Sequence, residues 1–272
     1  MRILALLLLC WSSAIGQQTP PANTGAAAQS NDQKARAAIA KMIETLGGQA
    51  YLNVQDSYSE GRYGRFHNET QVGGAKYYRY TRWPDADRWE LTEQRDYVQL
   101  FVGDKYYDVT YKGYTEGNPA KDDGLRQALV RRHYSLDHVL REWINQPGTI
   151  LLHQGLTLAE SKMAEKVTVI NSKNEAVTIM ISQDAHLPIK KVFTIRDPQY
   201  KELDEEAEIY DNWKMVQGVN TPYSTLATHN GQVLRQQYIL TISYNTNPPP
   251  AYFTPVLVKH TDQQGKDKRN KK

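Results

Sequence analysis

The chain has 272 residues, of which 40% are hydrophobic and 23% charged. This apolar content is enough for a sizeable core, which excludes a chain that is disordered throughout. The formal net charge of +3 comes from the two ends, because setting aside Arg2 and the six basic and two acidic residues of 259–272 leaves 26 basic and 28 acidic residues. A broad basic surface for nucleic acid is therefore not expected.

The first sixteen residues predict a secretory signal peptide. Met1 and Arg2 precede an apolar run over 3–11, which is shorter than the ~20 residues that a membrane span needs. Small residues follow and allow cleavage after Gly16 or after Ala14. The only cysteine, Cys10, lies in the apolar run, so we expect a mature chain without disulfides or thiol chemistry. We expect export to the periplasm of a two-membrane bacterium.

Residues 17–32 are predicted to be a disordered linker, because they are polar, rich in Pro and Ala, and show no packing pattern. A helix follows, and Ser30 and Gln33 fit a capping box at its start. Gly47 and Gly48 end this helix, since glycine accepts the left-handed conformation found just past a helix. The apolar residues at helical spacing on its one face are Ile39, Met42, Ile43 and Leu46.

From Val54 the apolar pattern changes to a period of two, which predicts strands joined by short turns. Eleven of the 18 tyrosines lie before residue 115. They fit either an aromatic platform for a sugar or lipid, or side chains suited to a half-exposed sheet surface. The predicted strands are 58–68, 75–83, 87–94, 97–103 and 105–113.

Residues 122–145 interrupt the strands with a predicted helical region. Ser135 is a candidate cap of a second helix after a kink, and Pro147-Gly148 ends the region. A metal site at His133 and His138 is disfavoured, because two histidines five residues apart on one helix point in different directions. The apolar residues at helical spacing are Leu125, Leu129, Leu136, Leu140 and Trp143.

A second series of strands follows, which brings the total to ten or eleven. The pair Asn230-Gly231 predicts a tight hairpin, because both positions of a type I′ turn need positive φ. Prolines 248–250 cannot donate to a ladder and end the last strand. The predicted strands are 166–170, 176–182, 187–196, 205–213, 219–228 and 233–245.

The alternation of these strands predicts a sheet with one strongly apolar face, and amphipathic helices against such a face can enclose a cavity. An apolar cavity would suit an acyl chain, whereas a filled face would be ordinary core, and the sequence alone does not separate the two. Chosen by alternation alone, the candidate cavity-lining residues are Val98, Leu100, Val177, Ile179, Ile181, Trp213, Tyr238, Leu240 and Ile242.

The sequence offers no catalytic residue that we would choose, and no metal site or cofactor is expected. It lacks HExxH, G-x-S-x-G, Walker and G-x-G-x-x-G motifs. Glu206 and Glu208 share a strand face and could act as paired carboxylates on a glycan. We interpret them instead as a solvated outer face, with Ala207, Ile209 and Trp213 on the opposite side.

Three segments resemble the outer-membrane lipoprotein-sorting proteins, which have a LolA-like fold. They are "TLGGQAYLNVQDSYSEGRYG" (45–64), "HLPIKKVFTIRDP" (186–198) and the stretch from "YDNWKMVQGVNTPYSTLATHNGQ" to "ISYNTNPPPAYFTP" (210–255). The resemblance implies a mainly β (α+β) fold: a curved antiparallel half-barrel whose helices cover a hydrophobic cavity on the concave face. Arg62, Arg65 and Arg79 are the candidates for the inward arginine of the lipoprotein carrier.

The resemblance implies a periplasmic, non-catalytic carrier or binder of a lipid or an acylated lipoprotein. It would form a monomer with a single domain over 33–258, a basic disordered tail over 259–272, and at most peripheral membrane contact. The alternative is an envelope sensor or binding module that recognises a protein or glycan partner through its Tyr-rich strands. A third hypothesis is a hydrolase that uses Glu206 and Glu208.

Overall fold

A computed structural model describes residues 30–197 and 200–259. The predicted signal peptide with Cys10, nearly all of the linker and nearly all of the basic tail lie outside the described residues. By its internal contacts the chain divides into Met1–Ser30 and Asn31–Lys272. The predicted domain over 33–258 falls within the second of these units, which is described below by itself.

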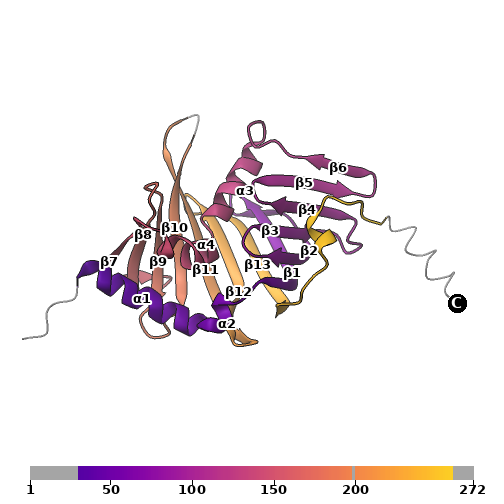
Figure 1. The fold of residues 1–272 in the computed structure, drawn as a ribbon. Helices are drawn as coiled ribbons and strands as arrows, with labels where there is room; N and C mark the ends of the chain where they lie inside the picture. The colour runs from indigo at the N-terminus through magenta and orange to yellow at the C-terminus, as the bar shows by residue number, and fades with distance from the viewer. Residues whose placement is uncertain (1–29, 198–199, 260–272) are drawn as a thin grey trace, which may run out of the picture. The chain divides into compact units, whose positions relative to one another are not determined.

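The described part of the chain forms one open sheet of thirteen antiparallel strands, in the order β6-β5-β4-β3-β2-β1-β13-β12-β11-β10-β9-β8-β7 (Figure 1). The sheet curves and does not close, so the predicted half-barrel is confirmed. The strands are β1 (Asp56–His67), β2 (Thr70–Arg82), β3 (Ala86–Glu90), β4 (Tyr97–Val102), β5 (Lys105–Thr110), β6 (Gly113–Glu116), β7 (Ile150–Ala159), β8 (Lys162–Ile170), β9 (Ala176–Ser182), β10 (Pro188–Arg196), β11 (Leu203–Val216), β12 (Val219–His229) and β13 (Gln232–Tyr244).

The expected count of ten or eleven strands was too low, because the two edge strands were missed. β6 has only four residues. In β7 the register shifts between His153 and Leu156, where Gly155 has φ 82°, so the chain shows no regular alternation there. The predicted hairpin between β12 and β13 is confirmed, since Asn230 and Gly231 have φ of 48° and 79°.

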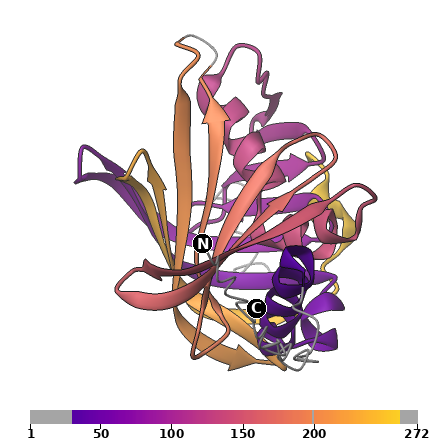
Figure 2. The ribbon, with the colours of Figure 1, turned by 90° about the vertical axis from the view of Figure 1, so that its left-hand side faces the viewer.

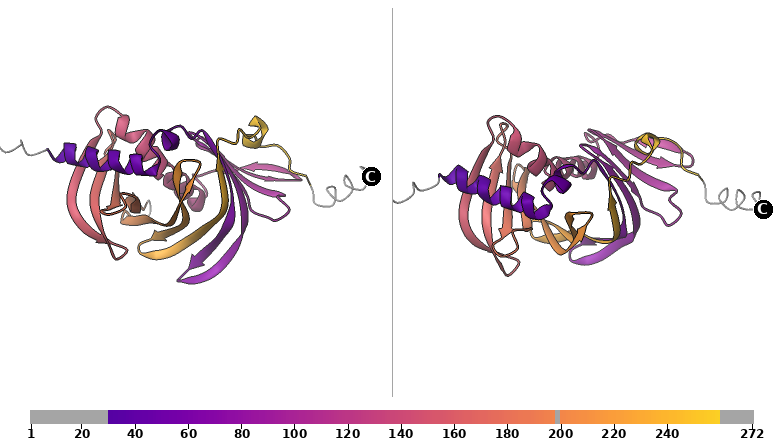
Figure 3. Two further views of the ribbon diagram at one scale, coloured as in Figure 1. Left: turned by 90° about the horizontal axis from the view of Figure 1, so that it is seen from below. Right: turned by 60° about the horizontal axis from the view of Figure 1, so that its bottom comes forward.

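The first helix, α1 (Asn31–Leu46), lies on the concave face against β7, β8 and β12 (Figure 3). Its predicted apolar face is confirmed: Ile39, Met42 and Leu46 are buried, and Ile43 packs against the same core. The short helix α2 (Gln49–Leu52) follows. Gly47 between them lies so close to the Gly218 carbonyl that a Cβ would collide with it, which is why the chain needs glycine here.

The predicted helical insertion is confirmed, and it consists of α3 (Asp123–His133), α4 (Leu136–Arg141) and the 3₁₀ turn η1 (Trp143–Asn145). Ser135 caps α4 as predicted, because its hydroxyl accepts the His138 amide. Asp122 caps α3 in the same way. Within the described residues, none of the helices combines the length and the apolar character needed to cross a membrane.

The two largest apolar cores lie on opposite faces of the sheet, because Val98 and Leu100 of the smaller core alternate along β4 with Phe101, which packs against α3. The larger core lies beneath α1 and the insertion, where Val139, Leu140 and Trp143 meet strands β8 and β9. The smaller core lies on β3–β5 and is covered by Phe253 of the C-terminal 3₁₀ turn η2 (Pro250–Phe253). Helices α1–α4 lie on the concave side of the sheet (Figure 2), whereas η2 covers the other face, and the candidate site lies between the helical insertion and the sheet.

Candidate functional site

A cavity of about 450 Å³ lies between the helical insertion and the middle of the sheet. Its lining comes from the end of α1 and from α2, from β1–β4, from α3 and α4, and from β11–β13. A volume of this size falls in the range of roughly 300–1,000 Å³ that is typical of small-molecule sites. The cavity is therefore large enough for a ligand and is bounded mostly by rigid strands.

Aromatic and aliphatic side chains form one part of the lining. Three tryptophans face the cavity, Trp83, Trp89 and Trp213. Ile239 and Ile242 of β13 add aliphatic surface. Such groups favour an apolar chain or ring, because each Å² of apolar surface removed from water contributes about 25 cal/mol.

Polar and charged groups form the rest of the lining, so the cavity combines the hydrophobic surface and the inward arginine that the family resemblance implied with further charges. Six arginines and four carboxylates reach it, which makes the lining electropositive. The arginines are Arg79, Arg82, Arg131, Arg132, Arg141 and Arg235, and the carboxylates are Asp56, Asp87, Asp137 and Glu208.

Asp87 of β3 joins the sheet to α3. Arg79 donates two hydrogen bonds to it, from Nε to Oδ1 and from Nη2 to Oδ2, both 2.9 Å long. Arg132 of α3 donates to Oδ2 at 2.9 Å. Burial by itself would raise the pKa of Asp87, but the Arg79 and Arg132 guanidinium groups hold this pKa below its usual value. Asp87 is therefore ionised and ties one end of α3 to the sheet.

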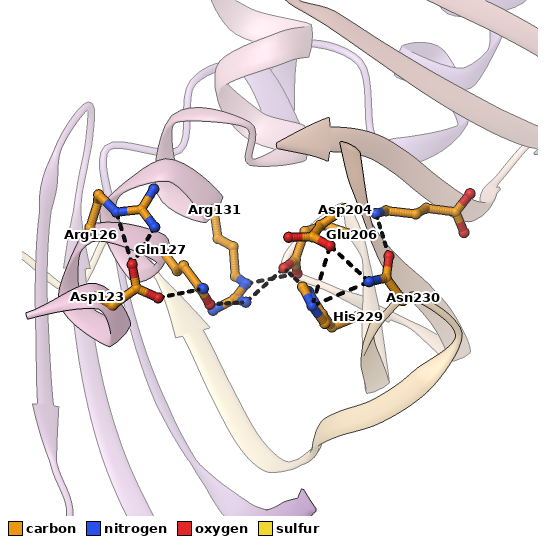
Figure 4. A network of polar contacts seen from close by, with 9 residues as sticks. Asp123, Arg126, Gln127, Arg131, Asp204, Glu206, His229 and Asn230 are labelled. Atoms are coloured by element: carbon orange, nitrogen blue, oxygen red, sulfur yellow. Dashed lines mark hydrogen bonds and ion pairs between the residues drawn. The ribbon is translucent and has the colours of Figure 1, made fainter. Parts of the chain in front are cut away.

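Glu206 of β11 holds the neighbouring part of α3 (Figure 4). Arg131 donates to both of its oxygens, at 2.8 and 2.7 Å, and His229 Nδ1 lies 2.8 Å from Oε1. The glutamate is only 2% exposed. The solvated outer face predicted for Glu206 is therefore wrong: the side chain points to the helices, where it binds a guanidinium.

Glu208 lies two residues further along the same face and has its own cation. Lys191 Nζ lies 2.8 Å from its Oε2, and the Tyr210 hydroxyl donates to it at 2.8 Å. Burial opposes ionisation, but the Lys191 ammonium outweighs it and lowers the pKa of Glu208 to about 2. Glu208 is therefore a partly buried, ion-paired carboxylate of the cavity wall, which also corrects the prediction of a solvated outer face.

The second helix of the insertion is held by α2. The Tyr51 hydroxyl donates to Asp137 at 2.7 Å, and Arg141 donates to the carbonyls of Leu52 and Val54 at 2.9 and 2.8 Å. The Arg141 guanidinium also lies 3.8 Å from the centre of the Trp83 ring. Hydrogen bonds and ion pairs thus hold both α3 and α4 over the cavity.

The predicted cavity-lining residues fall into three groups. Trp213 and Ile242 line the cavity. Val177, Ile179 and Ile181 lie in the core beneath α1, and Val98 and Leu100 lie in the smaller core with Phe253. Tyr238 and Leu240 are 44% and 57% exposed. That any of the nine binds a ligand stays a prediction.

A β-bulge explains why Tyr238 and Leu240 do not share a face with Ile242, as the alternation predicted. Glu60 pairs with Thr241 and Gly61 pairs with Ile239, so β13 has one residue more than β1 at Leu240. A Cβ on Gly61 would collide with the Tyr238 carbonyl, so the bulge needs glycine in the facing strand. The extra residue reverses the alternation: Arg235, Gln237 and Ile239 line the cavity before it, and Ile242 and Tyr244 after it.

Trp213 lies on the same side as Glu208, not opposite to it as the alternation predicted. Two exposed residues, Asp211 and Asn212, separate it from the buried Tyr210, and Asn212 has φ 55°. The alternation is therefore interrupted at Asn212. Both Glu208 and Trp213 line the cavity.

Most of the arginines that line the cavity were not predicted from the sequence. Of the three candidates for an inward arginine, Arg79 lines the cavity, whereas Arg62 and Arg65 are exposed on β1. His133 and His138 lie on different helices, and His133 Nε2 is 2.9 Å from Glu175. Among the described residues, no group of His, Cys, Asp and Glu is arranged to hold a metal ion.

Comparison with known proteins identifies the fold. No protein-family model and no curated protein matches the sequence. A DUF1329 family protein from Desulfovibrio piger has a similar structure, with a TM-score of 0.58 and 12% identity over 81% of this chain and 97% of that one.

Two further crystal structures are similar. A putative outer membrane lipoprotein-sorting protein domain from Vibrio parahaemolyticus has a TM-score of 0.53 and 10% identity, over 82% of this chain and 97% of that one. A LolA superfamily protein from Nitrosomonas europaea has a TM-score of 0.50 and 10% identity, over 81% of this chain and 97% of that one. The chain thus has the LolA-like fold that its three sequence segments predicted.

Proposed function

We propose that the protein is an exported, non-catalytic carrier or binding protein that takes a single-chain lipid, or the lipidated part of a protein, into the cavity. The observation that carries this proposal is the space of about 450 Å³ left open between the helical insertion and the middle of the sheet. Buried acyl chains contribute about 0.8 kcal/mol per CH₂. The tryptophans and isoleucines of the lining supply the apolar surface for such a chain.

Export and a periplasmic location are part of the proposal. They rest on the signal-peptide pattern of residues 1–16 and on the likeness to a lipoprotein-sorting domain. The lipoprotein-sorting part of the proposal rests on the likeness in fold.

A binding role is favoured over hydrolysis by the state of the two glutamates. Glu206 is held by Arg131 and Glu208 by Lys191. A glycosidase needs one carboxyl with a raised pKa as its proton donor, whereas the pKa of Glu208 is lowered to about 2. Neither contact leaves a carboxyl free to serve as that acid.

A sensor that reads its partner through the Tyr-rich strands is less well supported. The Tyr97 and Tyr106 hydroxyls both donate to Asp108 at 2.6 Å, and the Tyr58 hydroxyl donates to Glu60 at 2.7 Å. These rings and hydroxyls are engaged within the sheet. They favour a structural role for the tyrosines over an aromatic platform.

The test compares a peptide carrying one palmitoyl chain with the same peptide lacking the chain. Thr225 lines the cavity, so Thr225→Trp fills it, whereas Thr241→Trp places the same ring on an exposed position of β13. We expect wild type and Thr241→Trp to bind only the palmitoylated peptide, and Thr225→Trp to lose it, measured by isothermal titration. Equal binding by the two variants, or none by wild type, would overturn the proposal.

A further inference from the structure

One cavity arginine has no partner among the residues that the structure describes. Arg235 lies on β13, two residues before Gln237 and on the same face, and it lines the cavity. Within the described chain its guanidinium makes no hydrogen bond, ion pair or ring contact. The residue is partly buried, and a guanidinium that loses hydrating water is stabilised by pairing, so such a group calls for an explanation.

The other five arginines of the lining are all engaged. Arg79 and Arg132 bind Asp87, and Arg131 binds Glu206. Arg141 donates to two carbonyls of the α2 region, and Arg82 donates to the Pro248 carbonyl at 2.6 Å. Their charges serve the fold itself. Arg235 alone keeps its donors free for something that enters the cavity.

The surrounding charge leaves Arg235 uncompensated. Glu208, in register with it two strands away on the same sheet, attracts it, but this carboxylate already has Lys191 at 2.8 Å and the Tyr210 hydroxyl at 2.8 Å. Asp87 also attracts it and is already bound by Arg79 and Arg132. Burial, together with the nearby arginines Arg79 and Arg131, lowers the pKa of Arg235 from its usual value. An arginine stays protonated at neutral pH, so the site carries an unbalanced positive charge.

The neighbours of Arg235 divide into polar and apolar ones. Gln237 and, across the strand pair from it, Thr225 line the cavity beside it. Beyond them lie the apolar Ile239, Ile242 and Trp213. The lining therefore runs from a free cation and polar groups to hydrophobic side chains, which matches a molecule with an anionic head and an apolar chain.

We propose that Arg235 binds the oxyanion headgroup of an amphiphile, a carboxylate or a phosphate, while the chain lies against Ile239, Ile242 and Trp213. The planar guanidinium can donate two parallel hydrogen bonds to such a group. This inference rests on the proposed function and adds to it the chemical class of the ligand. The anion could belong to the amphiphile or be a free ion, and the test separates the two.

The experiment measures binding of decanoate, decyl phosphate, decanol and inorganic phosphate to the full chain by isothermal titration at pH 7.5. The variants are Arg235→Gln, which removes the charge, and Arg235→Lys, which keeps it but loses the planar fork. Arg62→Gln is the matched control, because Arg62 is an exposed arginine of β1 that lies outside the cavity lining. Thermal melting checks that each variant is folded.

We expect wild type and Arg62→Gln to bind both anionic amphiphiles about ten-fold or more tightly than decanol. Arg235→Gln should lower that preference to within about two-fold and leave decanol binding unchanged, with Arg235→Lys in between. Preference for the anions that persists in Arg235→Gln overturns the assignment, and so does equal binding of decanol and decanoate by wild type.

The outcome also separates this inference from the proposed function. If decanol binds but the anions gain nothing, the amphiphile cavity stands and the Arg235 site is wrong. If no amphiphile binds but inorganic phosphate binds and is lost in Arg235→Gln, the anion site stands and the carrier function is wrong. If wild type binds none of the four, both are overturned.

Discussion

The ion pair of the partly buried Glu208 with the buried Lys191 predicts that the stability of the fold falls in acid. The pKa of Glu208 is lowered from its usual 4.5 to about 2 in the folded protein. The folded state thus binds the proton more weakly than the unfolded state does. The resulting stability is complete above the unfolded pKa near 4.5 and is lost as the pH falls through the folded pKa near 2.

The magnitude follows from the two pKa values. Each pKa unit corresponds to about 1.36 kcal/mol, so ionised Glu208 contributes about 3 kcal/mol to the free energy of unfolding at pH 7. At pH 3 roughly half of this remains, because the unfolded carboxyl is by then protonated. Its side chain is 23% exposed, which keeps screening by solvent modest.

Glu208→Gln tests this reasoning, because glutamine mimics the protonated acid. Relative to wild type, the variant should lose about 3 kcal/mol at pH 7 and about half of that at pH 3, measured by urea unfolding followed by tryptophan fluorescence. Glu205→Gln changes an exposed neighbour on β11 and should show almost no loss. A loss that stays constant between pH 7 and 3, or no loss at pH 7, would refute the argument.

Two further predictions concern the ion pair that holds α3 and the bulge of β13. Arg131→Met leaves Glu206 buried without its guanidinium partner and should lower the free energy of unfolding by about 2–3 kcal/mol. It should also speed the amide hydrogen exchange of residues 123–133. Arg126→Met, which removes a more exposed ion pair with Asp123, should do neither. Unchanged exchange of α3 in Arg131→Met would contradict this. Gly61→Ala forces a Cβ onto the Tyr238 carbonyl and should lower the free energy of unfolding by about 2 kcal/mol or more, measured by thermal or urea unfolding. Gly64→Ala should lower it by less than about 1 kcal/mol. Equal losses in the two variants would count against the bulge.

The sequence predicted those elements whose burial follows a local period. The face of α1 and the run Val177, Ile179 and Ile181 in β9 repeat at 3.6 and 2 residues, and all lie in the larger core. The Asn230-Gly231 turn was predictable because it depends only on the φ of two residues. These features depend on neighbours close in the chain.

The cavity was not predictable in this way, because its geometry depends on distant partners. The pattern of its own strand predicts that Glu206 is solvated, but its guanidinium partner Arg131 lies 75 residues away in the sequence. The bulge that moves the cavity-facing positions of β13 by one residue needs Gly61 on the facing strand β1. A glycine inside a strand is the one signal in the sequence that indicates such a bulge.

Native mass spectrometry of the full chain, purified without detergent from its own cells, tests most directly whether the concave face holds an amphiphile. We expect the wild-type protein to carry an added mass of the size of an acyl-chain amphiphile. This mass should be lost on organic extraction and absent from Thr225→Trp. A clean protein mass that stays unchanged after incubation with decanoate and a palmitoylated peptide would contradict it.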